Sequence, residues 1–394
     1  MNDVFSPLVG QDVAVAALRA AAADAPATRA GRHSTAMTHA WLVTGPPGSG
    51  RSTAALAFAA ALVCPQGGCG TCGECTAVAH SAHVDVEHVV PESVTYAVDE
   101  TRELVRRSTI APSRSPWHVF VLEDADRLNA ESANTLLKSI EEPTPGTVWV
   151  LCAPSTEDVL ATIRSRCRHL MLATPTTAEV AQALVDKLGV DPAMASFAAR
   201  AAQGHIGRAR ALATDEGARL RRQDVLRIPT QLHDLGSCLA LAADLVGVVT
   251  DDAAAICDPL DERELAALRA AYGEGAEGRG IGTVERRAKG AFKALEDRQK
   301  RRRRRVVRDQ LDRAIVDLIA FYRDVLVVQL GAGSELVNDE MRPQIERVAA
   351  ESRPEETLRR VDALERTRHL LESNVPPLLA FESLTVSLRD PSLA

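Results

Sequence analysis

Hydrophobic and polar positions follow two different patterns along the chain. Up to about residue 171, short runs of β-branched and aromatic residues are separated by longer segments with helical spacing of apolar positions. The runs predicted as strands are residues 41–44, 84–90, 118–122, 147–152 and 169–172, and the segments predicted as helices are 52–63, 99–108 and 130–142. Strands that alternate with helices are typical of a parallel α/β sheet. We therefore expect one such sheet within residues 1–173.

The rest of the chain is predicted to be helical. Three short amphipathic segments joined by glycine or Asp-Pro turns follow the sheet, at residues 177–188, 191–202 and 207–220. Further on, apolar residues at three- and four-residue steps between Leu311 and Leu326 predict one amphipathic helix, and the glycine-rich residues 273–282 predict a flexible link. The expected fold class is α/β plus all-α, with domains over residues 1–173, 174–228 and 229–394.

Composition places the chain among ordinary globular proteins. Apolar residues make up 46% and charged residues 25%, while aromatic residues make up only 3%, which favours close-packed helices. No run approaches the ~20 apolar residues of a membrane span, and the first residues do not resemble a secretion signal. We expect a cytoplasmic protein with no membrane contact. The net charge of −7 argues against a protein that coats nucleic acid by itself.

A glycine-rich loop follows the first predicted strand. Its sequence, GPPGSGRS, places Gly45, Gly50 and Ser52 as in the phosphate loop G-x-x-x-x-G-K-[ST], with Gly48 between them. In that loop, backbone N–H groups and a lysine bind the phosphates, and the hydroxyl binds Mg²⁺. Arg51 replaces the lysine with a larger, planar cation. The loop is therefore either a degenerate site for ATP and Mg²⁺ or a loop retained for its shape.

An acidic pair, Glu123 and Asp124, follows the strand predicted at residues 118–122. In a competent site, an Asp holds the Mg²⁺ shell and the following Glu orients the attacking water. The reversed order shifts each carboxylate by about one methylene, and such chemistry depends on close positioning. The alternative interpretation is a solvated turn.

Four cysteines lie close together, with spacing typical of a metal knuckle over residues 64–75. Cys64, Cys69, Cys72 and Cys75 supply four thiolates on glycine-containing turns, which suits one tetrahedral ion. A closed structural zinc site is favoured over an iron–sulfur cluster, and four free thiols are the remaining alternative. Clustering of this kind indicates a reducing compartment. The downstream His80, His83 and His88 are interpreted as ordinary polar positions.

The most basic segment covers residues 298–305 and contains six arginines and one lysine. Runs of this kind often bind nucleic acid non-specifically, so Arg301 to Arg305 are candidates for DNA contact. The alternative is a solvated linker at the start of a helix. No interleaved aromatic residues support base stacking.

Together these motifs resemble the delta-prime subunits of the bacterial DNA polymerase III clamp loader. The similar segments are the entry motif from Phe5 to Gln11, the loop GPPGSGRS, the four-cysteine knuckle, the helix sequence NTLLKSIEEP and Ser165-Arg166-Cys167. The resemblance implies an AAA+ domain, a helical lid and a helical collar that builds a five-subunit ring. It also implies that Arg166 reaches into the nucleotide site of a neighbouring subunit, although an isolated Ser-Arg-Cys is otherwise an ordinary surface sequence.

Departures from the motor subunits of that family indicate which role the chain has. The motor subunits keep a lysine in the phosphate loop and an Asp-Glu pair after the strand, where this chain has Arg51 and Glu123-Asp124. They also keep a threonine at the end of the fourth strand and an arginine in the lid, where this chain has Ala153-Pro154 and Gly207. The resemblance therefore implies a non-motor subunit that joins ATPase subunits and a delta subunit in a hetero-pentamer. That assembly loads the sliding clamp onto primer–template DNA. The alternatives are an active ATPase of the gamma/tau type and a zinc-dependent nucleic-acid-binding factor.

Overall fold

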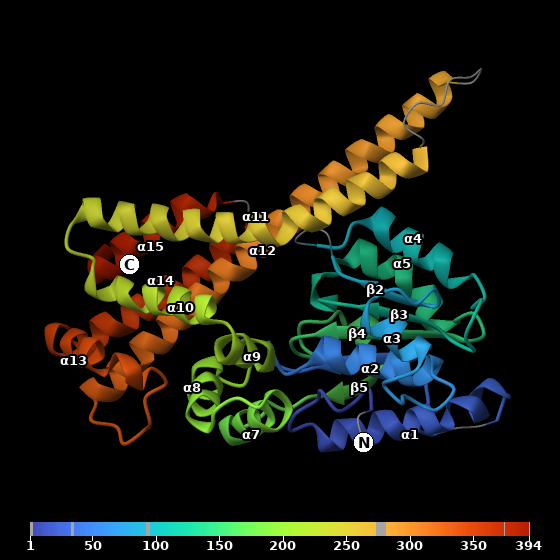
Figure 1. Cartoon of the computed structure of the whole chain (residues 1–394), viewed down its shortest axis with the longest axis horizontal. Helices are drawn as coiled ribbons and strands as arrows, with labels where there is room; N and C mark the ends of the chain where they lie inside the picture. Colours follow the sequence, from blue (N-terminus) through green and yellow to red (C-terminus); the bar gives the residue numbers. More distant parts are fainter. Residues whose placement is uncertain (1–2, 33–34, 92–94, 273–280, 374, 394) are drawn as a thin grey trace. The chain divides into compact units, whose positions relative to one another are not determined.

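Figure 1 shows the computed structural model of the chain, which describes residues 3–32, 35–91, 95–272, 281–373 and 375–393. The chain divides into two compact units, Met1–Asp215 and Glu216–Ala394. The first unit contains the sheet, and the described part of the second is helical. The finer division into three domains stays a prediction.

The described residues of the first unit form a five-stranded sheet in the order β2-β3-β4-β1-β5, and all neighbouring strands are parallel. The strands are β1 (Ala40–Thr44), β2 (Val86–Val89), β3 (His118–Leu122), β4 (Thr147–Ala153) and β5 (Arg168–Met171). Each predicted run therefore overlaps a strand. The predicted parallel α/β sheet is confirmed.

Helices cover both faces of this sheet (Figure 1). Val119 and Val121 of β3 lie in one apolar cluster with residues of two helices, and the alternate residues Phe120 and Leu122 lie in another cluster. The first cluster includes α1 (Asp12–Arg29) and α2 (Arg51–Val63), and the second includes α4 (Val98–Ser108), α5 (Ala130–Glu141) and the short α6 (Ala161–Arg164). Period-two alternation along the strands therefore separates the two layers of core. The helical pattern of α1 was missed because nine of its eighteen residues are alanine.

Three short helices complete the first unit. They are α7 (Thr177–Leu188), α8 (Pro192–Ala202) and α9 (Ile206–Thr214). Thr176 and Glu179 form a capping box that fixes the start of α7. The single helix predicted over residues 207–220 is wrong, because Asp215 adopts extended dihedrals (φ −116°, ψ 114°) and ends α9. The next helix, α10 (Glu216–Arg227), lies in the second unit.

The second unit is built around two long helices, α11 (Leu235–Tyr272) and α12 (Ile281–Gln329). The other helices of this unit that follow them are α13 (Arg342–Glu351), α14 (Pro354–Glu372) and α15 (Pro377–Arg389). Short 3-10 turns in the two units are Ala125–Arg127, Ile228–Thr230, Asp339–Met341 and Pro391–Leu393. The amphipathic helix predicted from Leu311 onward is the C-terminal part of α12, where Leu311, Ile315 and Leu318 are buried. None of the described helices is long and apolar enough to cross a membrane.

The arginine run lies in the middle of α12, beside α11 (Figure 1). Arg302 donates to Glu264 of α11 at 2.7 Å, and Arg303 donates to Asp261 at 3.1 Å. The hydrogen bond from Arg302 lowers the pKa of Glu264 to about 2. The solvated-linker interpretation is therefore wrong, because acidic residues of α11 pair with these arginines inside a helix. The DNA contact stays a prediction. The flexible link predicted at residues 273–282 falls outside the described residues, except that residues 281 and 282 begin α12.

Candidate nucleotide loop and metal centre

The glycine-rich loop connects β1 to the start of α2. Gly48 and Gly50 have φ values of +84° and +95°, a region that side-chain-bearing residues rarely adopt. Gly50 is the residue before α2, so the loop leads directly into the N-terminus of that helix. This is the general arrangement of an anion site at a helix N-terminus. The strand, glycine-rich loop and helix therefore follow one another as the sequence predicted, and the binding of a nucleotide stays a prediction.

Arg51 is turned back onto the loop that carries it. Its guanidinium Nη1 donates to the carbonyl oxygen of Gly45, the first residue of the motif. A lysine in this position would present a compact ammonium to the phosphates, whereas the planar guanidinium is engaged by the chain itself. The cation of the loop is thus used for an internal contact.

His205, the residue before α9, lies directly against the same loop. A methyl group added at Gly48 would be 2.2 Å from Cγ of His205 and 2.5 Å from its Cα, and the Ile206 N–H donates to the Gly48 carbonyl at 3.4 Å. The ring is held in place because its Nδ1 accepts the Arg208 N–H at 3.2 Å. The sequence analysis missed His205, since no local spacing connects it to a loop that precedes it by more than 150 residues.

Glu123 is buried at the end of β3, with 7% of its surface exposed, so the solvated-turn interpretation is wrong for it. Its Oε1 is 3.0 Å from His88 Nε2 on the neighbouring β2. Burial would raise the pKa of Glu123, but hydrogen bonds with His88 and Ser52 and the charge of Arg51 lower it. His88 is therefore not an ordinary polar position. Asp124 has a left-handed φ of +47° and pairs with Arg127 at 3.7 Å.

The entry motif ends beside the loop. Gln11 is buried, and its side chain bonds both the N–H and the carbonyl of Ala173, at 3.0 and 2.7 Å. Its Nε2 is also 3.5 Å from the Ser49 carbonyl. Leu8 lies against Gly50, since a methyl group there would be 3.3 Å from Leu8 Cδ2. The N-terminal segment and His205 thus both contact the loop.

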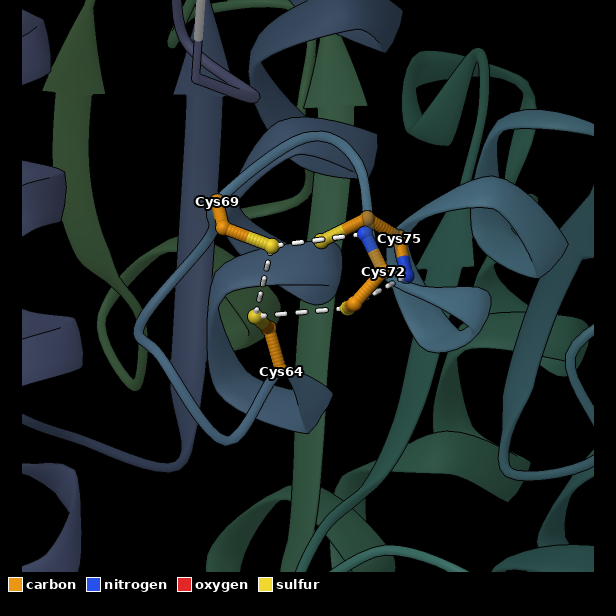
Figure 2. Close-up of side chains that lie close together, drawn as sticks. All are labelled: Cys64, Cys69, Cys72 and Cys75. Carbon is orange, nitrogen blue, oxygen red and sulfur yellow. Dashed lines mark hydrogen bonds between the residues drawn. The ribbon is translucent and has the colours of Figure 1, made fainter.

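The four cysteines of the knuckle converge at the other end of α2, as Figure 2 shows. Cys64 is the residue after α2, and Cys72 is the residue before the short helix α3 (Gly73–Ala79), which carries Cys75. Their sulfur atoms lie within 4.8 Å of one another. Cys64 Sγ is 3.8 Å from Cys69 Sγ and 3.6 Å from Cys72 Sγ. Four sulfurs bound to one ion at 2.3 Å would be about 3.8 Å apart, so the arrangement fits a tetrahedral metal.

Backbone N–H groups point at these sulfurs. The N–H groups of Gln66, Cys72 and Cys75 lie 3.3, 3.4 and 3.5 Å from the sulfurs of Cys64, Cys69 and Cys72, respectively. Donors from Thr71 and Cys72 lower the pKa of Cys69 to about 6. Burial raises the pKa of Cys75, and interactions with the neighbouring thiols of Cys72 and Cys64 raise it further. The N–H donors favour the thiolate form of the sulfurs that they contact. Several thiolates close together concentrate negative charge, and a bound cation compensates that charge.

The knuckle also supports its surroundings. The Val4 N–H donates to the Gly68 carbonyl at 3.1 Å, and a methyl group at Gly68 would be 2.6 Å from Val4 Cγ2. On the other side, Glu74 of α3 pairs with His83 Nε2 at 2.8 Å and with Arg114 Nε at 2.9 Å. The His83 side chain is almost fully buried, so it too is not an ordinary polar position, whereas His80 is exposed.

Arg166 lies in the turn between α6 and β5. Its side chain is 36% exposed and pairs with Glu141 at the end of α5. Its Nη1 donates to the Thr162 carbonyl at 2.7 Å. These contacts join Arg166 to α5 and α6 and not to residues 45–52 of the loop, so the structure does not bring the two groups of predicted site residues together within this chain.

Comparisons with known proteins agree on the first unit. A family described as "DNA polymerase III, delta subunit" matches residues 28–176. The DNA polymerase III subunit gamma/tau of Mycobacterium tuberculosis is 35% identical over 170 residues, which cover 42% of this chain and 28% of that protein. The subunit delta' of Pseudomonas aeruginosa is 35% identical over 163 residues, 40% of this chain and 50% of that one. This chain therefore spans at most half the length of these relatives.

Solved structures give a looser likeness. A RuvB variant of Thermotoga maritima covers 56% of this chain with a TM-score of 0.37 and 18% identity, and 64% of that chain is covered. A DNA polymerase III gamma-subunit-related protein of the same organism covers 66% of this chain with a TM-score of 0.35 and 14% identity, and 94% of that chain is covered.

The first unit combines a glycine-rich loop after β1, an acidic pair after β3 and three short helices after β5. Over residues 28–176, the chain is similar to subunits of DNA polymerase III. The resemblance predicted from the sequence motifs is confirmed at this level.

Proposed function

We propose that the chain is a delta-prime-type, non-motor subunit of the clamp loader, and that it donates Arg166 to the nucleotide site of a neighbouring ATPase subunit. The observation that carries the first part is the contact of His205 with Gly48, because it places a lid side chain against the loop that would hold phosphate. The engagement of Arg51 by the Gly45 carbonyl adds to it. Both contacts belong to the chain itself and must break before nucleotide binds.

Turnover by this chain has a further obstacle in the acidic pair. Glu123 stands where an Asp would hold the Mg²⁺ shell, and His88 already contacts its carboxylate. Gly45, Gly48, Gly50, Ser52 and Asp124 complete a loop that we propose keeps its architecture without hydrolysing ATP. Binding of ATP and Mg²⁺ is correspondingly disfavoured.

The metal that fits the knuckle best is zinc. Four thiolates with tetrahedral spacing leave no open position for a substrate, so the ion would supply stability and not catalysis. Cys64, Cys69, Cys72 and Cys75 would hold it. In the proposed assembly, the partners are ATPase subunits and a delta subunit in a hetero-pentamer, together with the sliding clamp and primer–template DNA.

The rival candidate is an active ATPase subunit, favoured by the match to relatives named gamma/tau. One experiment on a reconstituted loader separates the two. The purified chain alone should show no turnover of Mg-ATP, and Arg166→Ala should reduce turnover at the neighbouring site by about 10³–10⁵ when clamp and DNA are present. The complex then loses the share of its stimulated rate that this site contributes.

Arg168→Ala is the matched control for that substitution. Arg168 lies two residues further on, and its guanidinium donates to the carbonyls of Thr35 and Ala36 of its own chain, at 2.9 and 2.6 Å. We expect the stimulated ATPase rate of the complex with Arg168→Ala to stay near that of the unmodified complex. A full stimulated rate in the Arg166→Ala complex would remove the finger assignment, and turnover by the purified chain would favour the rival.

A further inference from the structure

The guanidinium of Arg166 has little donor capacity left for a partner. Nε donates to Oε1 of Glu141, and Nη2 forms an ion pair with the same oxygen. Nη1 donates to the Thr162 carbonyl at 2.7 Å and lies 3.2 Å from Ser165 Oγ. The Nε–Nη2 edge is one of the edges that a guanidinium offers to a phosphate as well as to a carboxylate. In this arrangement, that edge is occupied within the chain.

Glu141 is placed so that this pairing is favourable but weak. It is the last residue of α5, where the carbonyl end of the helix dipole disfavours a carboxylate and favours a nearby cation. Both side chains are partly exposed, 36% for Arg166 and 44% for Glu141. Exposed ion pairs contribute at most about 1 kcal/mol, which corresponds to roughly fivefold in an equilibrium or a rate. The contact is therefore strong enough to bias the side chain and weak enough to be released.

We propose that Glu141 is a positioning residue that holds Arg166 in a resting position on its own subunit. It competes there with the terminal phosphate of a nucleotide bound by the neighbour. This inference rests on the proposed role of Arg166 as a donor in trans. The pair would keep the ATPase rate low until clamp and DNA bring the subunits close enough for the phosphate to displace the carboxylate.

The test uses the reconstituted loader with Glu141→Gln, which keeps the shape of the side chain and removes its charge. We expect kcat without clamp and DNA to rise about two- to fivefold, and the fully stimulated kcat and the KM for ATP to stay unchanged. Glu141→Asp, which restores the charge on a shorter side chain, should return the unstimulated rate toward its original value. Glu142→Gln is the matched control, because Glu142 is the adjacent exposed carboxylate and does not contact Arg166.

The outcomes separate this inference from the proposed function. The rise must disappear in the double variant with Arg166→Ala. If Arg166→Ala lowers the stimulated rate but Glu141→Gln leaves the unstimulated rate unchanged or lowers it, the holding role is overturned and the finger stands. If Arg166→Ala has no effect on the stimulated rate, the finger itself fails, and the holding role fails with it.

Discussion

Two glycine-containing loops lie at opposite ends of α2, and they differ in what completes them. At the N-terminal end, the chain's own groups engage the loop, with Arg51 on the Gly45 carbonyl and His205 against Gly48. At the C-terminal end, four sulfurs face one another at the spacing of a metal site. One loop is closed by protein, whereas the other is shaped for an ion. Under the proposed function, a retained binding motif does not imply a retained ligand.

The largest expected effect comes from removing a metal ligand. Cys72→Ser should reduce bound metal from one equivalent to near zero and lower the free energy of unfolding of the first unit by about 4 kcal/mol or more, because loss of a structural metal is among the most destabilising changes. Elemental analysis and thermal unfolding measure the two quantities. Cys257→Ser, in α11 of the second unit, is the control and should keep its metal. Undiminished metal in Cys72→Ser would contradict the site.

A pair of glycine substitutions tests whether the other loop is closed by protein. Gly48→Ala places a methyl group against His205 at a positive φ, whereas Gly189→Ala has a similar φ of +63° and open space around it. The left-handed conformation costs about 1–2 kcal/mol at both positions, and the clash adds about 1–3 kcal/mol at Gly48 alone. Denaturant unfolding measures both losses. Equal losses would mean that His205 does not lie on the loop.

The smallest expected effect concerns a buried carboxylate directly before β2. Asp85 is buried, and its carboxylate accepts the N–H groups of Ser113, Arg114 and Ser115, each at 2.7 Å. Burial would raise the pKa of Asp85, but these hydrogen bonds lower it to about 2. Because the folded pKa lies below the unfolded value, the carboxylate stabilises the fold above about pH 4, and this contribution is lost as the pH falls toward 2.

Asp85→Asn should therefore lower the free energy of unfolding by about 2 kcal/mol at pH 7. The difference from the unmodified protein should shrink between pH 4 and pH 2 in unfolding curves recorded across that range. Asp99→Asn is the control, since Asp99 is 93% exposed and paired only with Arg102 among the described residues. A difference that does not depend on pH would show that packing, and not charge, explains the effect of Asp85.

Sequence patterns predicted the parts of the fold that depend on neighbouring residues. Strand positions followed from short apolar runs, and the knuckle followed from cysteines within twelve residues of each other. Gly48 was placed in the loop correctly, but its contact with His205 joins positions more than 150 residues apart. The same limit explains why His88 was not paired with Glu123 and why Glu141 was not paired with Arg166. Tertiary structure makes those contacts, and a single sequence contains no local signal for them.

The break between α9 and α10 has a different cause. Apolar spacing continued through residue 220, and the extended conformation of Asp215 was not marked by proline or glycine. The arginine run was misjudged as a linker for a related reason. Its partners Asp258, Asp261 and Glu264 lie on α11, some forty residues earlier, and charge density within the run gave no sign of them.

The N-terminal segment is held at both ends, by Gly68 of the knuckle at Val4 and by Ala173 at Gln11. Loss of the metal would therefore release a strip of chain that also borders the phosphate-type loop. A protease that cuts flexible chain near residues 4–11 would then report the metal content of a sample.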